Sequence, residues 1–292
     1  MEDYSNLKRS EKGAWVSIGA YIFLSFIKIS VAFIGNSEAL KADGLNNMTD
    51  IIASIAVLIG LRISRKPPDQ NHHYGHMRAE TISSLVAAFI MITVGLQVIW
   101  DTLQSIFSGQ GEQPSMITAW TALFSAFAMF GVYFFNLNLS KKVKSHSLKA
   151  VAQDNRSDAL VSIGAFVGII GAQFGAFWLD PAAGLIVGII ISKTAWDIFS
   201  DATHMLTDGF DIDQLLAIKN EISKDKGVMM VGDCKARVHG NHVLLEATIH
   251  VDPSLSVQES HEIADRIELH LKKEYEIHHS HIHIEPYSKT TT

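Results

Sequence analysis

Two short segments of the sequence place oxygen-bearing side chains in pairs, four residues apart. Asn46 and Asp50 form one pair, in ADGLNNMTDIIAS, and Asp154 and Asp158 form the other, in AQDNRSDAL. Residues at positions i and i+4 of an α-helix lie on one face, so each pair would present two oxygen ligands together. Two such helices packed face to face would bring four donors to one point, which predicts a site for a divalent cation.

The donor types bear on the choice of metal. Carboxylate and amide oxygens without histidine or cysteine favour Mn²⁺, Mg²⁺ or Ca²⁺, whereas zinc sites prefer imidazole and thiolate ligands. Affinity order alone would still favour zinc at many sites, so selectivity must also rest on coordination number and cavity geometry. Three carboxylates held close together repel one another when no metal is bound, and protons that replace the cation would relieve this repulsion.

The elements that must position these ligands are long apolar segments. The chain has 292 residues, 48% of them hydrophobic and only 18% charged, whereas an ordinary soluble domain carries roughly a quarter charged residues. A bilayer-spanning helix needs about 20 mostly apolar residues, and six such windows can be drawn: 14–35, 39–62, 82–107, 116–138, 148–172 and 178–199. The sequence therefore predicts an α-helical membrane protein with a bundle of six transmembrane helices.

A carboxylate at membrane depth costs at least a few kcal/mol, so it is a functional candidate by default. The alternative is that these groups lie near helix ends and are simply hydrated, which fits Asp154 better than Asp50. Asp43 extends the face of Asn46 and is expected either at a helix end or along an approach to the site. Asn47 and Asn155 are expected to point to other faces of their helices.

Basic residues predict the orientation of the bundle, because Lys and Arg accumulate on the cytoplasmic side. They gather in three of the predicted connecting segments, at Lys8, Arg9, Lys12, Arg62, Arg65, Lys66, Arg78, Lys141, Lys142 and Lys144. The alternate segments GNSEA, SGQGEQPS and AQFGAFWLD hold none. We therefore expect a multi-pass protein of the cell membrane with both termini in the cytoplasm. Asp180 and Pro181 are predicted as the N-cap and first residue of the sixth span.

A smaller domain is predicted after the last span. Residues 243–251 alternate between apolar and polar side chains, as in a half-buried strand. Ser256 and Glu259 have the spacing of a capping box that opens a helix. Weaker patterns add a helix near 215–222 and strands near 229–239 and 277–285. The resulting order α-β-β-α-β predicts a two-layer α+β domain, with the domains at 1–206 and 207–292.

Composition and missing motifs exclude several classes. The formal net charge of -6 argues against a nucleic-acid partner, which would need a basic face. The single cysteine excludes a cysteine-rich metal or disulfide framework. Neither the H-E-x-x-H motif of metal-dependent hydrolases nor a G-x-x-x-x-G-K-[ST] nucleotide-binding loop is present. We expect no enzymatic activity and no organic cofactor, and ion gradients remain as the energy source.

The two ligand segments and their surroundings resemble the cation diffusion facilitator family of metal transporters over nearly the whole chain. The combination N-x-x-x-D plus D-x-x-x-D, carried by Asn46, Asp50, Asp154 and Asp158, is similar to the manganese-exporting branch. The resemblance implies a homodimeric secondary transporter that exports Mn²⁺ in exchange for protons, with a ferredoxin-like cytoplasmic domain. Zn²⁺ or Fe²⁺ efflux by the same mechanism is the alternative, as is a membrane metal sensor without transport. A passive channel is disfavoured because rings of acids would be expected instead.

A second candidate metal site lies in the segment DQNHHYGHMRAE. Asp69, His72 and His76 have a spacing that metal ligands adopt, although a polar loop with histidines is often plain surface. The D-x-x-H-x-x-x-H pattern resembles the loop site of the same family, with His73 as an alternative to His72. The resemblance also implies an ion pair between Arg78 and Asp208.

Histidines of the C-terminal segment are the third candidate. Four alternate residues of the last predicted strand lie on one face: His279, His281, His283 and Glu285. They are either metal ligands or the exposed side of a sheet. The resemblance matches His261, His283 and Glu285 to part of a regulatory metal site, with His250 as a replacement ligand. Gly232 and Thr248 stand where zinc-type members have histidines, which disfavours a complete binuclear site.

Overall fold

The computed structural model describes residues 2–64, 66–108, 113–143, 146–239, 242–277 and 279–288. The side chains of Lys8, Arg9 and Lys12, together with Arg65 and Lys144, lie outside the described residues. The chain forms two compact units, residues 1–56 with 86–198 and residues 57–85 with 199–292. The predicted domain boundary at 206–207 stays a prediction.

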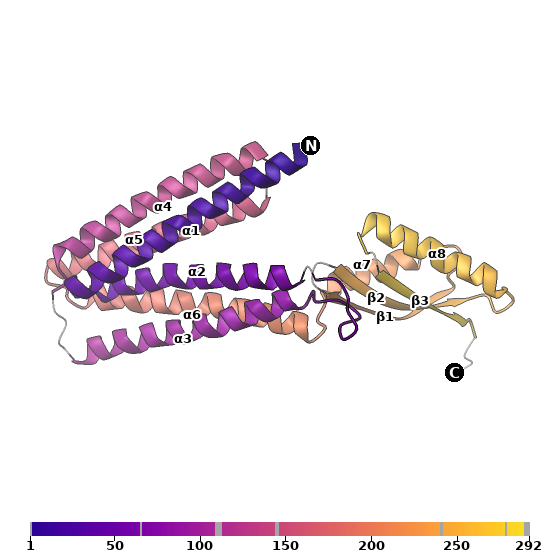
Figure 1. The fold of residues 1–292 in the computed structure, drawn as a ribbon. Helices are drawn as coiled ribbons and strands as arrows, with labels where there is room; N and C mark the ends of the chain where they lie inside the picture. The colour runs from indigo at the N-terminus through magenta and orange to yellow at the C-terminus, as the bar shows by residue number, and fades with distance from the viewer. Residues whose placement is uncertain are drawn as a thin grey trace. The chain divides into compact units, whose positions relative to one another are not determined.

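Six long helices cover the predicted membrane windows (Figure 1). They are α1 (Glu2–Gly35), α2 (Glu38–Ser64), α3 (Ala79–Ser108), α4 (Met116–Val143), α5 (His146–Gln173) and α6 (Leu179–Leu206). Among the described residues, five of them are long and apolar enough to cross a membrane; α5, which carries Asp154, Arg156 and Asp158, is not among these five. The predicted helical membrane bundle is confirmed, with α5 as its most polar member.

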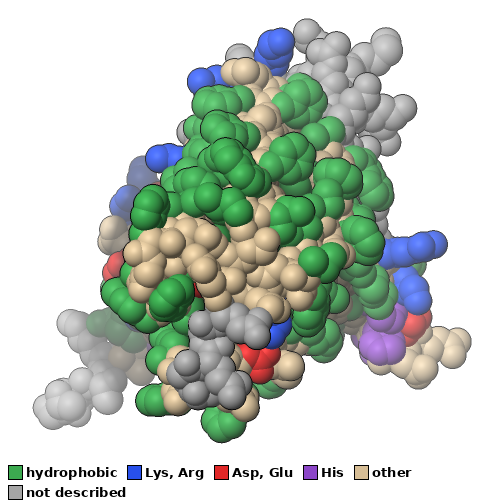
Figure 2. Space-filling view, turned by 90° about the vertical axis from the view of Figure 1, so that its left-hand side faces the viewer, with side chains coloured by type: hydrophobic (Ala, Val, Ile, Leu, Met, Phe, Trp, Pro, Cys, Tyr) green, Lys and Arg blue, Asp and Glu red, His purple; other side chains and the backbone are tan. Residues whose placement is uncertain are grey.

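The bundle exposes large apolar side chains. Phe26, Phe33, Trp100, Phe107 and Phe174 each leave two thirds or more of their surface uncovered, and hydrophobic side chains spread across the face drawn in Figure 2. An exposed apolar surface of this extent suits contact with lipid. The helices can cross the hydrocarbon layer because their backbone hydrogen bonds are made within each helix.

Small residues set the packing inside the bundle. Helices α1, α4 and α5 lie side by side (Figure 1). One buried cluster in the bundle consists largely of alanines from α1, α2, α4 and α5, at Ala32, Ala39, Ala119, Ala122 and Ala165. A Cβ at Gly168 would stand 2.6 Å from the Cβ of Ala183, so only glycine lets α5 approach α6 this closely. Because the helix backbones approach closely, a polar side chain on one helix is within hydrogen-bonding reach of polar side chains on its neighbours.

The prediction that Asp180 caps its own helix is wrong. Helix α6 begins one residue earlier, at Leu179, and the buried Asp180 carboxylate turns to the start of α2. It accepts hydrogen bonds from Ser37 Oγ at 2.7 Å and from the Glu38 amide at 2.8 Å. The first amides of α2 have no partner within that helix, so the tertiary contact satisfies them instead.

The C-terminal domain has the predicted order of elements. It contains α7 (Ile212–Ile222), β1 (Met230–His239), β2 (His242–Val251), α8 (Val257–Glu274) and β3 (His279–Pro286). In the sheet, β2 lies between β1, to which it is antiparallel, and β3, to which it is parallel. Helices α7 and α8 cover one face (Figure 1), with Ile222, Leu245 and Leu271 among the core residues. The capping box of Ser256 and Glu259 is confirmed.

Candidate metal centres

The membrane helices bring one residue of each predicted pair into direct contact. Asn46 of α2 donates a hydrogen bond from Nδ2 to Asp158 Oδ1 of α5, at 3.0 Å, and both side chains are buried. The two residues are 112 positions apart. The contact therefore comes from the packing of α2 beside α5, as the face-to-face arrangement of the two pairs predicts.

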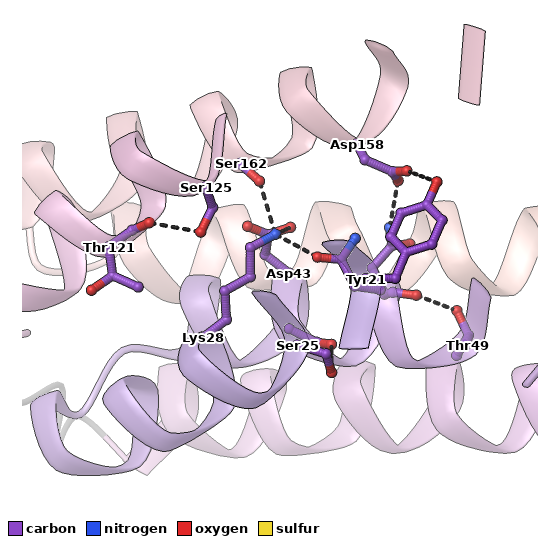
Figure 3. A network of polar contacts seen from close by, with 12 residues as sticks. Tyr21, Ser25, Lys28, Asp43, Thr49, Thr121, Ser125, Asp158 and Ser162 are labelled. Carbon is purple, nitrogen blue, oxygen red and sulfur yellow. Dashed lines mark hydrogen bonds and ion pairs between the residues drawn. The ribbon is translucent and has the colours of Figure 1, made fainter. Parts of the chain in front are cut away.

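The other oxygen of Asp158 is held by a residue that the sequence analysis missed. Tyr21 of α1 donates its hydroxyl proton to Asp158 Oδ2 at 2.7 Å (Figure 3). Tyr21 in turn accepts a hydrogen bond from Asn155 Nδ2 at 2.9 Å. The only signal for Tyr21 was a phenol inside an apolar span, since a buried tyrosine hydroxyl normally finds a partner.

A polar chain continues from Tyr21 away from the ligands. Asn155 Oδ1 accepts hydrogen bonds from Ser17 Oγ at 3.0 Å and from Asn136 Nδ2 at 2.9 Å. Asn155 is linked to Asp158 through the Tyr21 hydroxyl, and no hydrogen bond joins Asn155 to Asp158 directly among the described contacts. This chain ties α1, α4 and α5 together and fixes the position of the Tyr21 hydroxyl that holds Asp158.

The remaining two predicted ligands do not join this contact. Asp50 Oδ2 is buried without a hydrogen-bond partner, and the Asp154 side chain is exposed. The carboxylates of Asp50, Asp154 and Asp158 are not among the described groups of three whose ligand atoms all lie within 4.8 Å of one another. Asp50 nevertheless interacts electrostatically with both other acids. The structure thus brings Asn46 and Asp158 together, whereas Asp50 and Asp154 lie outside their contact.

The segment between α2 and α3 brings its three predicted ligands together. The ligand atoms of Asp69, His72 and His76 lie within 4.8 Å of one another. Asp69 Oδ1 lies 3.1 Å from His72 Nδ1, and Asp69 Oδ2 lies 3.6 Å from His76 Nε2. His73 instead places its Nε2 3.1 Å from the carbonyl oxygen of Gln70. The geometry favours His72 over His73 as the partner of Asp69.

A turn orients the Asp69 carboxylate. Its Oδ1 accepts hydrogen bonds from the backbone amides of Asn71 and His72, at 2.9 and 2.8 Å. The amide of Asn71 contributes most to lowering the pKa of Asp69, and His72 lowers it further. The carboxylate therefore stays ionised, which a metal ligand requires.

The expected ion pair of Arg78 and Asp208 is present. Arg237 of β1 adds a second contact, with Nη1 3.5 Å from Asp208 Oδ2. A backbone φ of 61° places Asp208 in the left-handed region just after α6. Two arginines from different segments thus meet one carboxylate, and only the first was predicted.

In the C-terminal domain, Glu285 is the residue on which the predicted ligands meet. Its Oε1 lies 3.5 Å from His283 Nε2, and its Oε2 lies 3.8 Å from His250 Nδ1 across the β2 and β3 pair. His261 pairs with Asp265 of its own helix α8, at 3.1 Å. A Cβ at Gly232 would stand 3.1 Å from His250 Nε2. Gly232, which replaces a histidine of the zinc-type pattern, therefore lies directly beside His250.

Long apolar helices that bring the buried oxygen donors of Asn46 and Asp158 together, followed by a small α+β domain, are typical of a multi-pass membrane transporter for cations. Residues 14–207 match the model of the cation efflux transmembrane domain, and residues 210–287 match that of the cation efflux protein cytoplasmic domain. The chain belongs to the cation efflux family, the cation diffusion facilitators that the ligand motifs resemble, and is a transporter rather than an enzyme.

Three relatives from Bacillus subtilis (strain 168) align over nearly their full length. The chain is 54% identical to manganese efflux system protein MneS, over 98% of this chain and 99% of that protein. It is 51% identical to uncharacterized transporter YdbO over the same shares. Manganese efflux system protein MneP is 30% identical, over 95% of this chain and 96% of its own length.

Proposed function

We propose that this protein exports Mn²⁺ from the cytoplasm across the cell membrane in exchange for protons. The contact between Asn46 and Asp158 carries the proposal, because it joins the two helices on which all four hard oxygen donors lie. Two relatives that align along almost the entire chain are named as manganese efflux proteins. Oxygen donors without imidazole or thiolate suit Mn²⁺ better than they suit Zn²⁺.

Metal binding at this site would require a rearrangement of the hydrogen bond between Asn46 and Asp158. Asn46 now offers its amide nitrogen to Asp158, and it must turn its carbonyl oxygen toward the cation to serve as a ligand. Asp158 would then exchange the Asn46 contact for the metal while Tyr21 keeps its second oxygen in place. Asp50, whose Oδ2 has no hydrogen-bond partner, completes the set with Asp154.

Protons would replace the metal on the return step. Asp50, Asp154 and Asp158 interact electrostatically, and like charges held close together cannot all stay ionised cheaply once the cation has left. Proton binding to these carboxylates relieves the repulsion and couples the cycle to the proton gradient. Asn46 cannot take up a proton, so the three carboxylates carry this part of the cycle.

The loop and the C-terminal domain would bind metal outside the bundle. Asp69, His72 and His76 supply two imidazoles, which bind zinc as well as manganese, so we expect the loop site to be less selective than the membrane site. In the C-terminal domain the ligand set is His250, His283 and Glu285, with His261 set apart on α8. We further propose that two chains associate through this domain and that both termini lie in the cytoplasm.

Uptake of Mn²⁺ and Zn²⁺ into proteoliposomes with an imposed pH gradient tests the proposal. We expect faster transport of Mn²⁺ than of Zn²⁺, and we expect Asn46→His to narrow that difference because it introduces an imidazole, a ligand that Zn²⁺ prefers. Asp101→Asn, which changes a partly exposed acid of α3, should leave the ratio unchanged. Zn²⁺ transport as fast as that of Mn²⁺ would remove the selectivity claim, and binding without flux would indicate a sensor.

A further inference from the structure

A second cage of oxygen atoms lies beside the proposed transport site, on the same two helices. Asp43 and Asn47 come from α2, three residues before and one residue after Asn46, and Ser162 comes from α5, four residues after Asp158. Asp43 was expected at a helix end or along an approach to the site. It lies within α2 rather than at its end, and it is fully buried.

The ammonium group of Lys28 from α1 fills this cage (Figure 3). Lys28 Nζ donates hydrogen bonds to Asp43 Oδ1 at 2.9 Å, to Asn47 Oδ1 at 2.7 Å and to Ser162 Oγ at 3.0 Å. An ammonium has three N–H donors, and all three are used. The side chains of Lys28 and Asp43 are both 0% exposed, and Lys28 is the one buried Lys or Arg in the part of the chain that the structure describes.

The cage has capacity beyond what Lys28 uses. Asp43 Oδ2 is buried and has no hydrogen-bond partner. A buried carboxylate oxygen without a donor is costly, and this oxygen remains available as a further acceptor in the cage. Asn47 Nδ2 is likewise buried without a partner, so only the carbonyl oxygen of Asn47 serves the ammonium. Carboxylate, amide and hydroxyl oxygens from two helices form a donor set that suits a hard cation.

We propose that Asp43, Asn47 and Ser162 form a second cation-binding position in the membrane bundle, which the tethered ammonium of Lys28 occupies in place of a free metal ion. The charge of Lys28 also acts on Asp50 and Asp158. While Lys28 is seated, its ammonium fills the cage, so a free metal ion cannot bind there. The proposal adds to the proposed function, and its test measures binding instead of transport.

Removal of the ammonium should open the cage to a free ion. The full-length Lys28→Met variant, purified in detergent, is compared with the unaltered protein by equilibrium dialysis against radioactive Mn²⁺. We expect one additional Mn²⁺ per chain in the variant. Lys41→Met is the matched control on α2: it breaks an ion pair with Asp101 at 3.0 Å that is partly exposed, so water can hydrate the acid that remains, and no additional Mn²⁺ should bind.

Two further variants assign the additional ion to the cage. Loss of a repelling charge could also tighten the transport site, so the comparison is repeated with Asp158→Ala present in both proteins. The proposal requires the additional Mn²⁺ to persist with Asp158→Ala and to disappear with Lys28→Met/Asp43→Asn. An ion that disappears with Asp158→Ala and persists with Asp43→Asn is bound at the transport site, and this result would overturn the proposal while leaving the proposed function intact.

Folding of Lys28→Met is itself informative, because removing one partner of a buried ion pair is strongly destabilising. If the variant aggregates, purification in Mn²⁺ should rescue a monodisperse protein. Lys28→Met/Asp43→Asn, which leaves no buried charge, should need no Mn²⁺. Aggregation of Lys28→Met with and without Mn²⁺, while the double variant folds, would show that a free cation cannot replace the ammonium.

Discussion

The two candidate metal sites, one between the membrane helices and one in the loop between α2 and α3, are assembled in different ways. In the loop, Asp69, His72 and His76 come together within a short stretch of sequence, and two backbone amides orient the carboxylate. In the membrane, Asn46 and Asp158 meet across 112 positions of sequence and depend on a third helix for Tyr21. Contacts within one segment assemble the loop group, whereas the packing of three helices assembles the membrane contact. A rearrangement of the helices would separate the Asn46 and Asp158 side chains, as the proposed transport cycle requires.

The largest expected effect comes from Asp158→Ala. This change removes the carboxylate on which Asn46 and Tyr21 both converge, and we expect Mn²⁺ transport to fall by more than about 100-fold, since removing even a supporting partner of a ligand costs 10 to 100-fold. Initial rates in proteoliposomes measure it. Loop metal binding should be unchanged, and joint loss of both would contradict the separation of the two sites.

A smaller effect is expected from Tyr21→Phe. The phenol hydroxyl only positions Asp158, so its loss should lower Mn²⁺ affinity or rate by about 10-fold and leave residual transport. Tyr133→Phe on α4 is the control. Metal titration and rate measurements separate the two contributions, and a Tyr21→Phe protein as active as the control would show that Asp158 needs no support from α1.

The loop site should be separable from transport. We expect His76→Ala to weaken metal binding at the loop by at least about 10-fold, because one of three ligands is lost, while Mn²⁺ transport at saturating metal changes less than twofold. His73→Ala is a close control, because His73 contacts a backbone carbonyl outside the ligand group. Complete loss of transport in His76→Ala would place the loop on the obligatory path of the ion.

The smallest effect is expected in the C-terminal domain. Arg266 lowers the pKa of Asp225 through bonds of 2.7 Å. A carboxyl whose pKa is lower in the folded state stabilises that state above the unfolded pKa of about 3.9, and the stabilisation is lost as the pH falls through the lower folded value. Asp225→Asn should therefore cost about 1 kcal/mol or less at pH 7, because Arg266 is half exposed.

Hydrogen exchange of the α7 and α8 amides in the full-length protein measures this cost. The difference between Asp225→Asn and the unaltered chain should shrink as the pH falls below 4. Asp265→Asn, which changes an exposed acid of α8, is the control. A difference that stays constant on acidification would show that the Asp225 charge does not contribute.

The periodicity of the sequence predicted which residues share one face of a helix or strand. It could not predict which side chains from different helices contact one another. The i, i+4 spacing predicted that the two helices face each other at Asn46 and Asp158, and alternation predicted β2. That Asn46, Asp50, Asp154 and Asp158 bind one metal ion stays a prediction.

Neither Tyr21 nor Lys28 belongs to a pair of candidate ligands with helical spacing. The pattern of the sequence therefore gave no indication of their roles. Asp180 has the residue type and position of a helix cap, yet its carboxylate accepts a hydrogen bond from the Glu38 amide at the start of α2. This contact between helices cannot be predicted from the local sequence.

The exchange of Mn²⁺ for protons is tested most directly by counting both ions in one experiment. Proteoliposomes that hold a pH-sensitive dye receive a pulse of Mn²⁺ with no initial pH gradient, and Mn²⁺ uptake is measured in parallel. The account predicts proton movement opposite to Mn²⁺, in a fixed ratio, and loss of both fluxes in Asp158→Ala. Mn²⁺ uptake with no proton flux, or a proton flux that survives Asp158→Ala, would contradict coupling through this site.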